Sequence, residues 1–475
     1  MDLAKAYQIA EDAVTALVKD KGSQHKFPFD AIWKYAKSDV PSRQRPAMQR
    51  KLLTGGYIEP TGGFTTAESE SRAGSPTKEY RPGPKFVQPP AKSKSGTQPA
   101  QGGASVASAL TNLVAAMDSR GFIVLPEQLT NFYLALLSSP LVIMTGTSGT
   151  GKSRLPWLFA ELIGSGFKKV AVQPQWDDNS DMFGYTSPLQ TTQFIRGEFT
   201  LAIEEATKKP TVPFVVLLDE MNLAAVEHYF SDFLSVIETR RRQSGSVITD
   251  SLPLDLPQPP QSPDPYASLR SLPLPHHVKV VGTANMDETT RSFSPKVLDR
   301  AFSIEFEDVD LSAFPSQAAG SEIKKSEFEI LASRIADSQN PVSVGEAYSK
   351  NPEICQEAAS YLETIRVILA PSGLSFAYRT RDAVCYYMYH WQRDNLTSLL
   401  PKEDALDYCV LQKVLPKVHG QGELLNQVLE QLKTWLDGKK VEPYENSPGF
   451  VRSSAKLDRM IKRLAADGTT TYWGT

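Results

Sequence analysis

The sequence predicts an α/β protein: a parallel-sheet domain with a P-loop, followed by a helical lid and preceded by a small winged-helix-like domain. From residue 107 onward, short apolar runs alternate with stretches of helical periodicity, as in a parallel sheet covered by helices on both faces. One apolar run leads into the spacing GxxxxGK[ST]. Another ends in two consecutive carboxylates, at the strand end where open α/β sheets bind ligands.

Residues 1–80 predict a small domain of helices and a hairpin. Apolar residues at helical spacing indicate three helices, and Thr61-Gly62-Gly63 between two strand-like segments indicates the hairpin. The expected ranges are 2–20, 28–36 and 41–54 for the helices and 57–66 for the hairpin. Three helices followed by a hairpin is the layout of a winged helix-turn-helix, whose third helix enters the major groove of DNA.

The third expected helix carries the basic side chains that we expect to contact DNA: Arg43, Arg45, Arg50 and Lys51. Of the 51 Lys and Arg and the 54 Asp and Glu of the chain, residues 1–100 hold 16 and 10. A basic N-terminal region joined to an acidic remainder favours a polyanionic partner. Charge alone does not specify DNA, so a protein-interaction domain with a solvated basic face is the alternative.

The remaining elements follow from composition and periodicity. The chain from residue 68 to 106 is rich in Pro, Gly, Ser and Lys, and residues 81–106 are predicted to be a flexible linker. We expect the P-loop domain over residues 107–325 and the helical lid over 326–475. The expected helices of the P-loop domain are 108–120 and 126–137, and its expected strands are 122–125, 141–145, 170–172, 214–218 and 278–283. Residues 242–277 hold many prolines and no periodicity, which indicates an insert, and a last helix is expected at 453–466.

The apolar run 141–145 leads directly into a predicted phosphate-binding loop. The loop consists of Gly146, Thr147, Ser148, Gly149, Thr150, Gly151, Lys152 and Ser153. Glycines let backbone N–H groups point at phosphate oxygens, and the following helix adds the positive end of its dipole. Lys152 supplies a cation for the β- and γ-phosphates, and the Ser153 hydroxyl is a ligand for Mg²⁺. The sequence therefore predicts a site for a nucleoside triphosphate with Mg²⁺.

A second strand-like run, 214–218, delivers Asp219 and Glu220 at its end. Asp219 is predicted to hold Mg²⁺, directly or through water, and Glu220 to act as general base on the attacking water. Two acids after an apolar run can also be a plain strand end, but the phosphate-binding loop upstream favours catalysis.

Three further polar residues are candidates for the same reaction. Asn285 follows the run 278–283 and is expected to orient the attacking water, with a turn-forming Asn as the alternative. Arg300 ends a short predicted helix, where an arginine of a ring-forming NTPase can reach the site of the neighbouring subunit, with a surface salt bridge as the alternative. In the helical lid, Arg379 or Arg381 is expected to contact the γ-phosphate, and we favour Arg379.

The composition and the spacing of the cysteines argue against a disordered, a disulfide-stabilised, a zinc-binding and a membrane-spanning protein. Hydrophobic residues make up 41%, which is enough for a large core, and the net charge is −3. The three cysteines, Cys355, Cys385 and Cys409, form no disulfide or zinc spacing and are predicted to be buried. No run reaches the ~18 apolar residues of a membrane span, so we expect a soluble, cytoplasmic protein without a membrane partner.

Taken together, these motifs resemble the McrB-like family of AAA+ proteins, the NTPase subunits of modification-dependent restriction systems within the dynein-related AAA group. The resemblance covers about residues 107–475. It rests on the strings that span residues 131–155, 173–185, 218–238, 282–300, 411–420 and 454–463.

The resemblance implies an AAA+ fold, a ring, most simply a hexamer, with sites between subunits, a McrC-like nuclease partner and a DNA-reading N-terminal domain. The chain would then be the motor subunit of a McrBC-like restriction or anti-phage defence complex, and it shows no nuclease signature of its own. GTP-using members carry Met-Asn-x-x-Asp where this chain has Ala284-Asn285-Met286-Asp287-Glu288, which favours ATP and leaves GTP open. The alternative function is a ring ATPase chaperone that remodels a protein client, with the N-terminal domain as adaptor.

Overall fold

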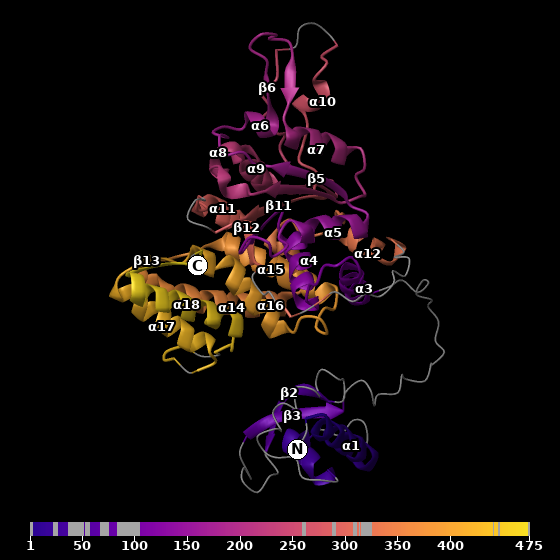
Figure 1. The fold of residues 1–475 in the computed structure, drawn as a ribbon, viewed down its shortest axis with the longest axis vertical. Coiled ribbons are helices and arrows are strands. Elements are labelled where there is room, and N and C mark those ends of the chain that lie inside the picture. The colour runs from indigo at the N-terminus through magenta and orange to yellow at the C-terminus, as the bar shows by residue number, and fades with distance from the viewer. Residues whose placement is uncertain are drawn as a thin grey trace. The chain divides into compact units, whose positions relative to one another are not determined.

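The computed structural model describes residues 3–21, 27–36, 52, 58–66, 76–82, 105–258, 263–286, 291–306, 311–312, 314, 325–439, 441–444 and 447–473. The chain divides into two compact units, Met1–Gln101 and Gly102–Thr475 (Figure 1).

The second unit is built on a parallel sheet, which confirms the predicted α/β P-loop AAA+ fold class. Its strand order is β12-β4-β11-β8-β5, and all four neighbouring pairs are parallel. The strands are β4 (Leu141–Thr145), β5 (Gly166–Ala171), β8 (Phe214–Asp219), β11 (Val278–Ala284) and β12 (Ala301–Glu305). Strands β4 and β11 are buried along their whole length, which explains their continuous apolar runs.

Helices cover both faces of this sheet. Val142 and Met144 of β4 belong to one hydrophobic cluster, whereas Leu141 and Ile143 belong to another, as the alternation of side chains along a strand requires. The first cluster includes α3 (Val106–Ser119), α4 (Pro126–Ser138) and α5 (Arg154–Ile163). The second includes α6 (Ser180–Phe183), α7 (Glu198–Thr207), α8 (Val226–Tyr229) and α9 (Ser231–Val236).

The helical region after residue 325 shares the first cluster with the sheet. Its main helices are α12 (Glu329–Ile335), α13 (Val344–Lys350), α14 (Pro352–Leu369), α15 (Tyr378–Arg393), α16 (Lys402–Lys413), α17 (Glu423–Leu436) and α18 (Val451–Asp467). A small hairpin of β13 (His419–Gln421) and β14 (Thr469–Thr471) closes the region. Tyr387 of α15 stacks on Phe302 of β12 with ring centroids 5.6 Å apart. The expected lid is therefore packed directly against the sheet.

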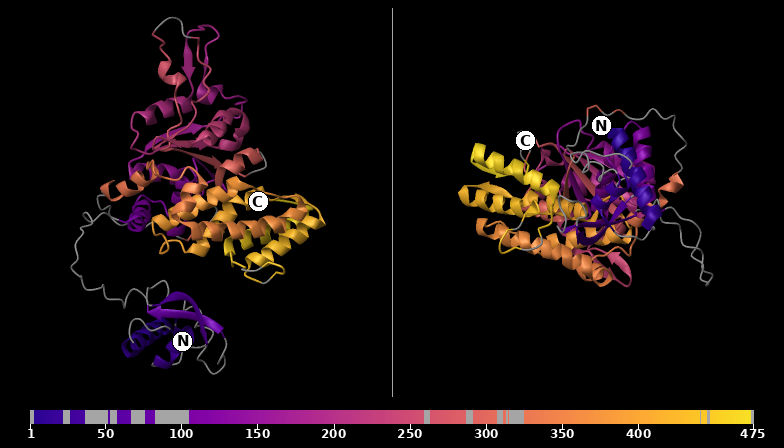
Figure 2. Two further views of the ribbon diagram at one scale, coloured as in Figure 1. Left: turned by 180° about the vertical axis from the view of Figure 1, so that it is seen from behind. Right: turned by 90° about the horizontal axis from the view of Figure 1, so that it is seen from below.

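A projecting arm lies at the opposite end of this unit from helices α14, α17 and α18 (Figures 1 and 2). It combines the hairpin of β6 (Gly184–Thr186) and β7 (Phe194–Arg196) with the part of the insert around α10 (Ala267–Arg270). The backbone N–H of Phe194 donates to the Tyr266 hydroxyl at 3.0 Å, which joins the two parts. Nearer the helical region, the insert begins with a second hairpin of β9 (Arg241–Gln243) and β10 (Ser246–Ile248).

The structure corrects one predicted strand of the second unit and adds one that was not predicted. Residues 122–125 form no strand; Phe122 instead stacks against Phe306 with ring centroids 6.4 Å apart, so its apolar character serves packing. The edge strand β12 was not predicted. It begins at Ala301, directly after α11 (Pro295–Arg300), and no turn residue separates the helical from the strand pattern.

The first unit contains α1 (Leu3–Lys21), β1 (Phe27–Pro28), a 3₁₀ helix η1 (Phe29–Tyr35), β2 (Ile58–Thr66) and β3 (Pro76–Pro82). Its sheet has the order β1-β3-β2. The predicted hairpin within 57–66 is wrong: these residues form one strand with an irregularity between Pro60 and Phe64, and the partner β3 lies in the segment assigned to the linker composition. Of the third expected helix only Leu52 is described, and Arg43, Arg45, Arg50 and Lys51 lie outside the described residues, so the winged-helix assignment and its DNA contacts stay predictions.

Candidate nucleotide-binding site

The predicted phosphate-binding loop connects β4 to α5 at the carboxyl edge of the sheet. Gly146, Gly149 and Gly151 have φ values of 139°, 86° and 96°, a region that residues with a side chain rarely adopt. A Cβ atom at Gly151 would also lie 2.6 Å from Cε2 of Phe122. The loop therefore needs glycine for its backbone conformation and, at Gly151, for space as well.

Lys152 lies against this loop. Its side chain is buried, and Nζ donates to the carbonyl oxygens of Gly146 and Thr147 at 2.8 and 2.7 Å. The ammonium group is thus held where phosphate oxygens bound by the loop would meet it.

Asp219 is the centre of a cluster of donors at the end of β8. The Ser153 and Thr283 hydroxyls donate to Oδ1 at 2.5 and 2.9 Å, and Lys169 Nζ lies 2.7 Å from Oδ2. Burial alone would raise the pKa of the Asp219 carboxyl, but the hydrogen bonds from Lys169, Ser153 and Thr283 outweigh it and hold the pKa below its usual value. The carboxylate is therefore ionised at neutral pH.

Ser153 and Asp219 are suited to Mg²⁺. The ion prefers hydroxyl, carboxylate and water oxygens and is held in nucleotide sites by one or two protein groups together with phosphates. The described residues contain no group of three or more His, Cys, Asp or Glu side chains that could hold a metal without a substrate. The structure thus brings together the two residues that the sequence assigned to the metal, and it adds Lys169 and Thr283. Lys169 and Thr283 lie on β5 and β11, the two strands that neighbour β8. The sequence did not indicate these two residues, because it did not predict which strands are neighbours in the sheet.

Glu220 leaves the strand in a left-handed conformation, with φ 55° and ψ 48°. Its backbone N–H donates to the Thr283 hydroxyl at 3.1 Å, so Thr283 contacts both acidic residues. A left-handed conformation in a residue with a side chain costs roughly 1–2 kcal/mol, and such strain is found at functional sites. The Glu220 side chain is exposed at the same edge as the phosphate-binding loop.

Asn285 follows β11, the strand between β4 and β8, and so lies at the same edge of the sheet. The side chain of Asn222 donates to the Asn285 carbonyl oxygen at 2.9 Å, and the Arg291 N–H donates to the Asn222 carbonyl oxygen at 3.1 Å. The buried Asn222 was not among the predicted site residues. The hydrogen bonds of Asn222 link the residues after β11 to the turn that follows Glu220.

Arg300 lies at the opposite edge of the sheet from the phosphate-binding loop. It precedes Ala301, which pairs with Leu141 at the start of β4, whereas the loop follows Thr145 at its end. A five-residue strand spans roughly 13 Å. Arg300 forms an ion pair with Glu238, and its Nε donates to the Leu234 carbonyl oxygen at 2.9 Å.

Arg379 lies beside Arg300 rather than over the loop of its own chain. Its Nη2 is 2.6 Å from Oε1 of Glu238, and its Nη1 is 3.9 Å from Oδ2 of Asp299. Arg381 pairs with the adjacent Asp382 at 2.7 Å. The structure thus brings both favoured arginines to one carboxylate and does not bring Arg379 to the phosphate-binding loop of the same chain.

A cleft of about 340 Å³ opens between α4, α5, the end of β12 and helices α16 and α18. Apolar Phe132, Leu155 and Leu411 line it together with polar Gln128 and Glu305. Glu305 pairs with Thr145, the last strand residue before the loop, so the cleft adjoins the candidate phosphate site.

The three cysteines and Trp176 are buried. Cys355, Cys385 and Cys409 are free and buried, as predicted. Trp176 is packed against Tyr229 with ring centroids 5.5 Å apart. Within the described part of the chain, no helix is long and apolar enough to cross a membrane.

One protein-family model supports the class that this fold and site define. Residues 141–301 match the model of the AAA domain of the dynein-related subfamily, which places this segment among AAA+ ATPase domains. Residues 333–469 match a second model, a domain of unknown function (DUF8727). None of the curated proteins matches the chain. Among solved structures, a protein described as a candidate ATPase of Cytophaga hutchinsonii is similar, with 14% identity, a TM-score of 0.39 and coverage of 65% of this chain and 86% of that chain.

Proposed function

We propose that residues 102–475 hydrolyse a nucleoside triphosphate bound at the loop between β4 and α5. The observation that carries this proposal is the cluster of Ser153, Asp219 and Thr283 beside the exposed Glu220. The loop N–H groups and Lys152 hold the β- and γ-phosphates. Bound Mg²⁺, held by Ser153 and Asp219, supplies charge neutralisation to the phosphates. Glu220 accepts the proton of the attacking water, which Asn285 orients.

Arg300 and Arg379 complete this site from a neighbouring subunit in the proposal. Both lie at the amino edge of the sheet, which their own phosphate-binding loop does not reach. A guanidinium group that neutralises transition-state charge in trans raises the rate of phosphoryl transfer by 10³-fold or more in other NTPases, about 4 kcal/mol. A ring of subunits, most simply a hexamer, would bring each arginine pair to the next nucleotide.

The nucleobase is proposed to enter the cleft lined by Gln128, Phe132 and Glu305. Apolar Phe132, Leu155 and Leu411 offer surface for a planar heterocycle, and the cleft also presents polar and charged groups that can hydrogen-bond to it: Gln128, Asn131, Glu305, Tyr408, Arg452 and Arg459. ATP is the favoured substrate and GTP the alternative, since the two bases differ in few hydrogen-bonding groups.

The wider role that we propose is that of a motor subunit in a McrBC-like restriction or defence complex. The support is the resemblance of residues 107–475 to the McrB-like family and the excess of basic residues in the N-terminal region. In this role Arg43, Arg45, Arg50 and Lys51 contact DNA, and a McrC-like nuclease is the partner. The alternative, a ring chaperone that remodels a protein client, shares the same nucleotide site.

The test is hydrolysis of ATP and GTP side by side, with and without duplex DNA, by wild type and Glu220→Gln. We expect turnover to fall at least about 100-fold in Glu220→Gln, because the water loses its base, while nucleotide affinity is kept. Glu205→Gln is the matched control, since Glu205 is exposed on α7. Unchanged turnover in Glu220→Gln would remove the proposed mechanism. Turnover that does not respond to DNA would favour the chaperone alternative.

A further inference from the structure

A cleft at the amino edge of the sheet contains an arginine that the proposed reaction does not use. The cleft has a volume of about 390 Å³ and lies between the start of β4, the end of α11 and helices α15 and α16. Its basic side chains are Arg240, Arg300, Arg379 and Lys413. Three of these four have partners: Arg300 and Arg379 bind Glu238, and Lys413 donates to backbone carbonyl groups.

Arg240 is the exception. It lies between α9 and β9, its Nε is buried, and this N–H has no hydrogen-bond partner within the described part of the chain. Its guanidinium group forms no ion pair with any residue that the structure describes, unlike Arg241 and Arg242, which pair with Asp250 and Glu346. Arg240 as a whole is half-buried, but a buried N–H of a cation without a partner is costly, and buried guanidinium groups are normally paired with an oxyanion.

The environment of Arg240 does not compensate its charge fully. Burial lowers the pKa of its guanidinium group and the neighbouring Arg242 adds to this, and the opposite contributions of Tyr386 and Glu346 do not restore the pKa to its usual value. The buried Lys279 of β11 is also close enough that the charge of Arg240 contributes to lowering the pKa of that ammonium group. An anion in the cleft would raise the pKa of both Arg240 and Lys279 toward their usual values.

The acidic groups of the cleft are already engaged. Asp299 lies 2.5 Å from Lys417 Nζ, and Asp382 lies 2.7 Å from Arg381. Glu238 bridges Arg300 and Arg379 and so shows that these two guanidinium groups can hold one oxyanion between them. None of these carboxylates forms an ion pair with Arg240, although Glu238 is only two residues away.

We infer that this cleft is an oxyanion site for a phosphate group and that Arg240 is its third guanidinium ligand. This inference deepens the proposed function: the phosphate is the γ-phosphate of the nucleotide on the neighbouring subunit, or free inorganic phosphate. Phosphate carries more oxygens than a carboxylate, so it can take donors from Arg240 as well as from Arg300 and Arg379.

Arg240→Met tests the site, with Arg241→Met as the matched control one residue away on the exposed side. Nucleotide hydrolysis by full-length Arg240→Met should fall at least 10-fold relative to Arg241→Met, with unchanged affinity for a non-hydrolysable ATP analogue. Inorganic phosphate, added at constant ionic strength with chloride, should raise the thermal unfolding midpoint of wild type and Arg241→Met but not of Arg240→Met.

Mixing experiments distinguish the two sources of phosphate. Arg240→Met and Glu220→Gln are each defective alone, but a mixed ring places an intact Arg240 opposite an intact Glu220. Activity of the mixture above the sum of its parts identifies the nucleotide of the neighbouring subunit as the ligand. Loss of the phosphate-dependent midpoint shift without this complementation identifies free phosphate.

The inference is overturned if Arg240→Met matches Arg241→Met in both hydrolysis and phosphate response. If Arg240→Met does not fold, Arg240→Lys replaces it, because lysine keeps the charge and loses the planar fork, and the same losses are expected in reduced form. If wild type hydrolyses no nucleotide, the proposed function fails, and the phosphate-dependent unfolding of the same proteins still decides whether the oxyanion site exists.

Discussion

Lys279 is a charged residue in the middle strand of a parallel sheet, where continuous burial normally selects apolar side chains. Desolvation by burial, with a smaller contribution from Arg240, lowers the pKa of its ammonium group from 10.5 to about 7. Because the folded pKa lies below the unfolded one, the folded protein gives up a proton more easily than the unfolded chain. The cost of burying the charge is therefore complete below pH 7 and declines as the pH rises from about 7 to 10.5.

Lys279→Met should consequently stabilise the protein in a pH-dependent manner. We expect a gain in unfolding free energy on the order of a few kcal/mol at pH 6 that becomes small by pH 10, measured by denaturant unfolding across this range. Lys208→Met, at an exposed position after α7, is the control and should show no such trend. A Lys279→Met protein that is no more stable than wild type at pH 6 would contradict the depressed pKa.

Thr283 joins the two acidic residues of the nucleotide site with one hydroxyl group. It accepts from the Glu220 N–H and donates to Asp219. Thr283→Val keeps the shape and removes both hydrogen bonds, so we expect turnover to fall by about 30-fold, in keeping with about 1 kcal/mol for each of the two bonds lost. Thr200→Val on α7, also buried and bonded to a carbonyl group, is a control that should change stability and leave turnover per folded molecule unchanged.

At the scale of elements, the end of α11 is held by two other helices. Lys413 of α16 donates to the carbonyl oxygens of Leu298, Asp299 and Ala301, at 3.4, 3.0 and 2.6 Å. The Ser139 hydroxyl, after α4, donates to the Arg300 carbonyl oxygen at 2.9 Å. Four consecutive carbonyl groups at the end of a six-residue helix are therefore all bound, which fixes the backbone of Arg300.

Lys413 should act on hydrolysis through Arg300. We expect Lys413→Met to lower turnover by at least about fivefold, since three carbonyl groups around Arg300 lose a common donor and the arginine is displaced. The same substitution in an Arg300→Ala background should have little further effect, because residues that act through one group are not additive. Equal losses from Lys413→Met in both backgrounds would show that Lys413 contributes to stability only.

At the scale of the whole molecule, burial determined which secondary-structure elements could be predicted from the sequence. Strands β4, β8 and β11 were predicted because strands buried on both faces are continuous apolar runs. Strand β12 was missed because it adjoins α11 without a turn. The position of Arg379 depends on how α15 packs against the sheet, and no local pattern encodes that contact. The phosphate-binding loop and the acidic pair, in contrast, are local motifs whose strand context alone determined their place at the carboxyl edge.

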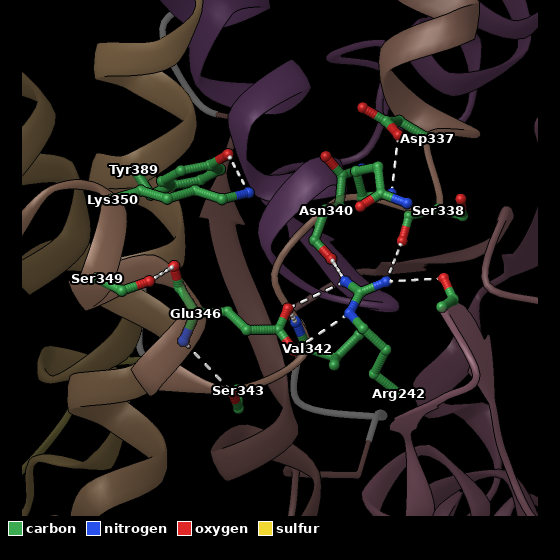
Figure 3. Close-up of polar contacts among 12 residues, drawn as sticks. Arg242, Asp337, Ser338, Asn340, Val342, Ser343, Glu346, Ser349, Lys350 and Tyr389 are labelled. Atoms are coloured by element: carbon green, nitrogen blue, oxygen red, sulfur yellow. Dashed lines mark hydrogen bonds and ion pairs between the residues drawn. The ribbon is translucent and has the colours of Figure 1, made fainter.

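A polar network joins the insert to the helical region across this unit (Figure 3). Arg242 of β9 binds both carboxylate oxygens of Glu346 in α13, at 3.3 and 3.0 Å, and donates to the carbonyl oxygens of Ser338 and Asn340 at 2.8 and 3.1 Å. Arg393 of α15 then donates to the Asn340 side chain at 2.7 Å. The guanidinium group of Arg242 thus binds the insert to α13 and to the turn between α12 and α13, and that of Arg393 binds the same turn to α15.

Removing this guanidinium group should loosen the helical region. We expect Arg242→Met to lower the free energy of unfolding by about 1–3 kcal/mol, because Glu346 and two carbonyl groups lose their donor while remaining partly buried. The hydrogen bond from Arg242 is the main reason that the pKa of Glu346 lies below its usual value. This stabilisation is present above the ordinary glutamate pKa and is lost as the pH falls through the lowered one, so the penalty of Arg242→Met should diminish in acid. Denaturant unfolding at pH 7 and at pH 3.5 measures this difference for wild type, Arg242→Met and the exposed control Arg241→Met. A loss of unfolding free energy in Arg242→Met that is equal at both pH values would contradict the role of the Arg242–Glu346 pair.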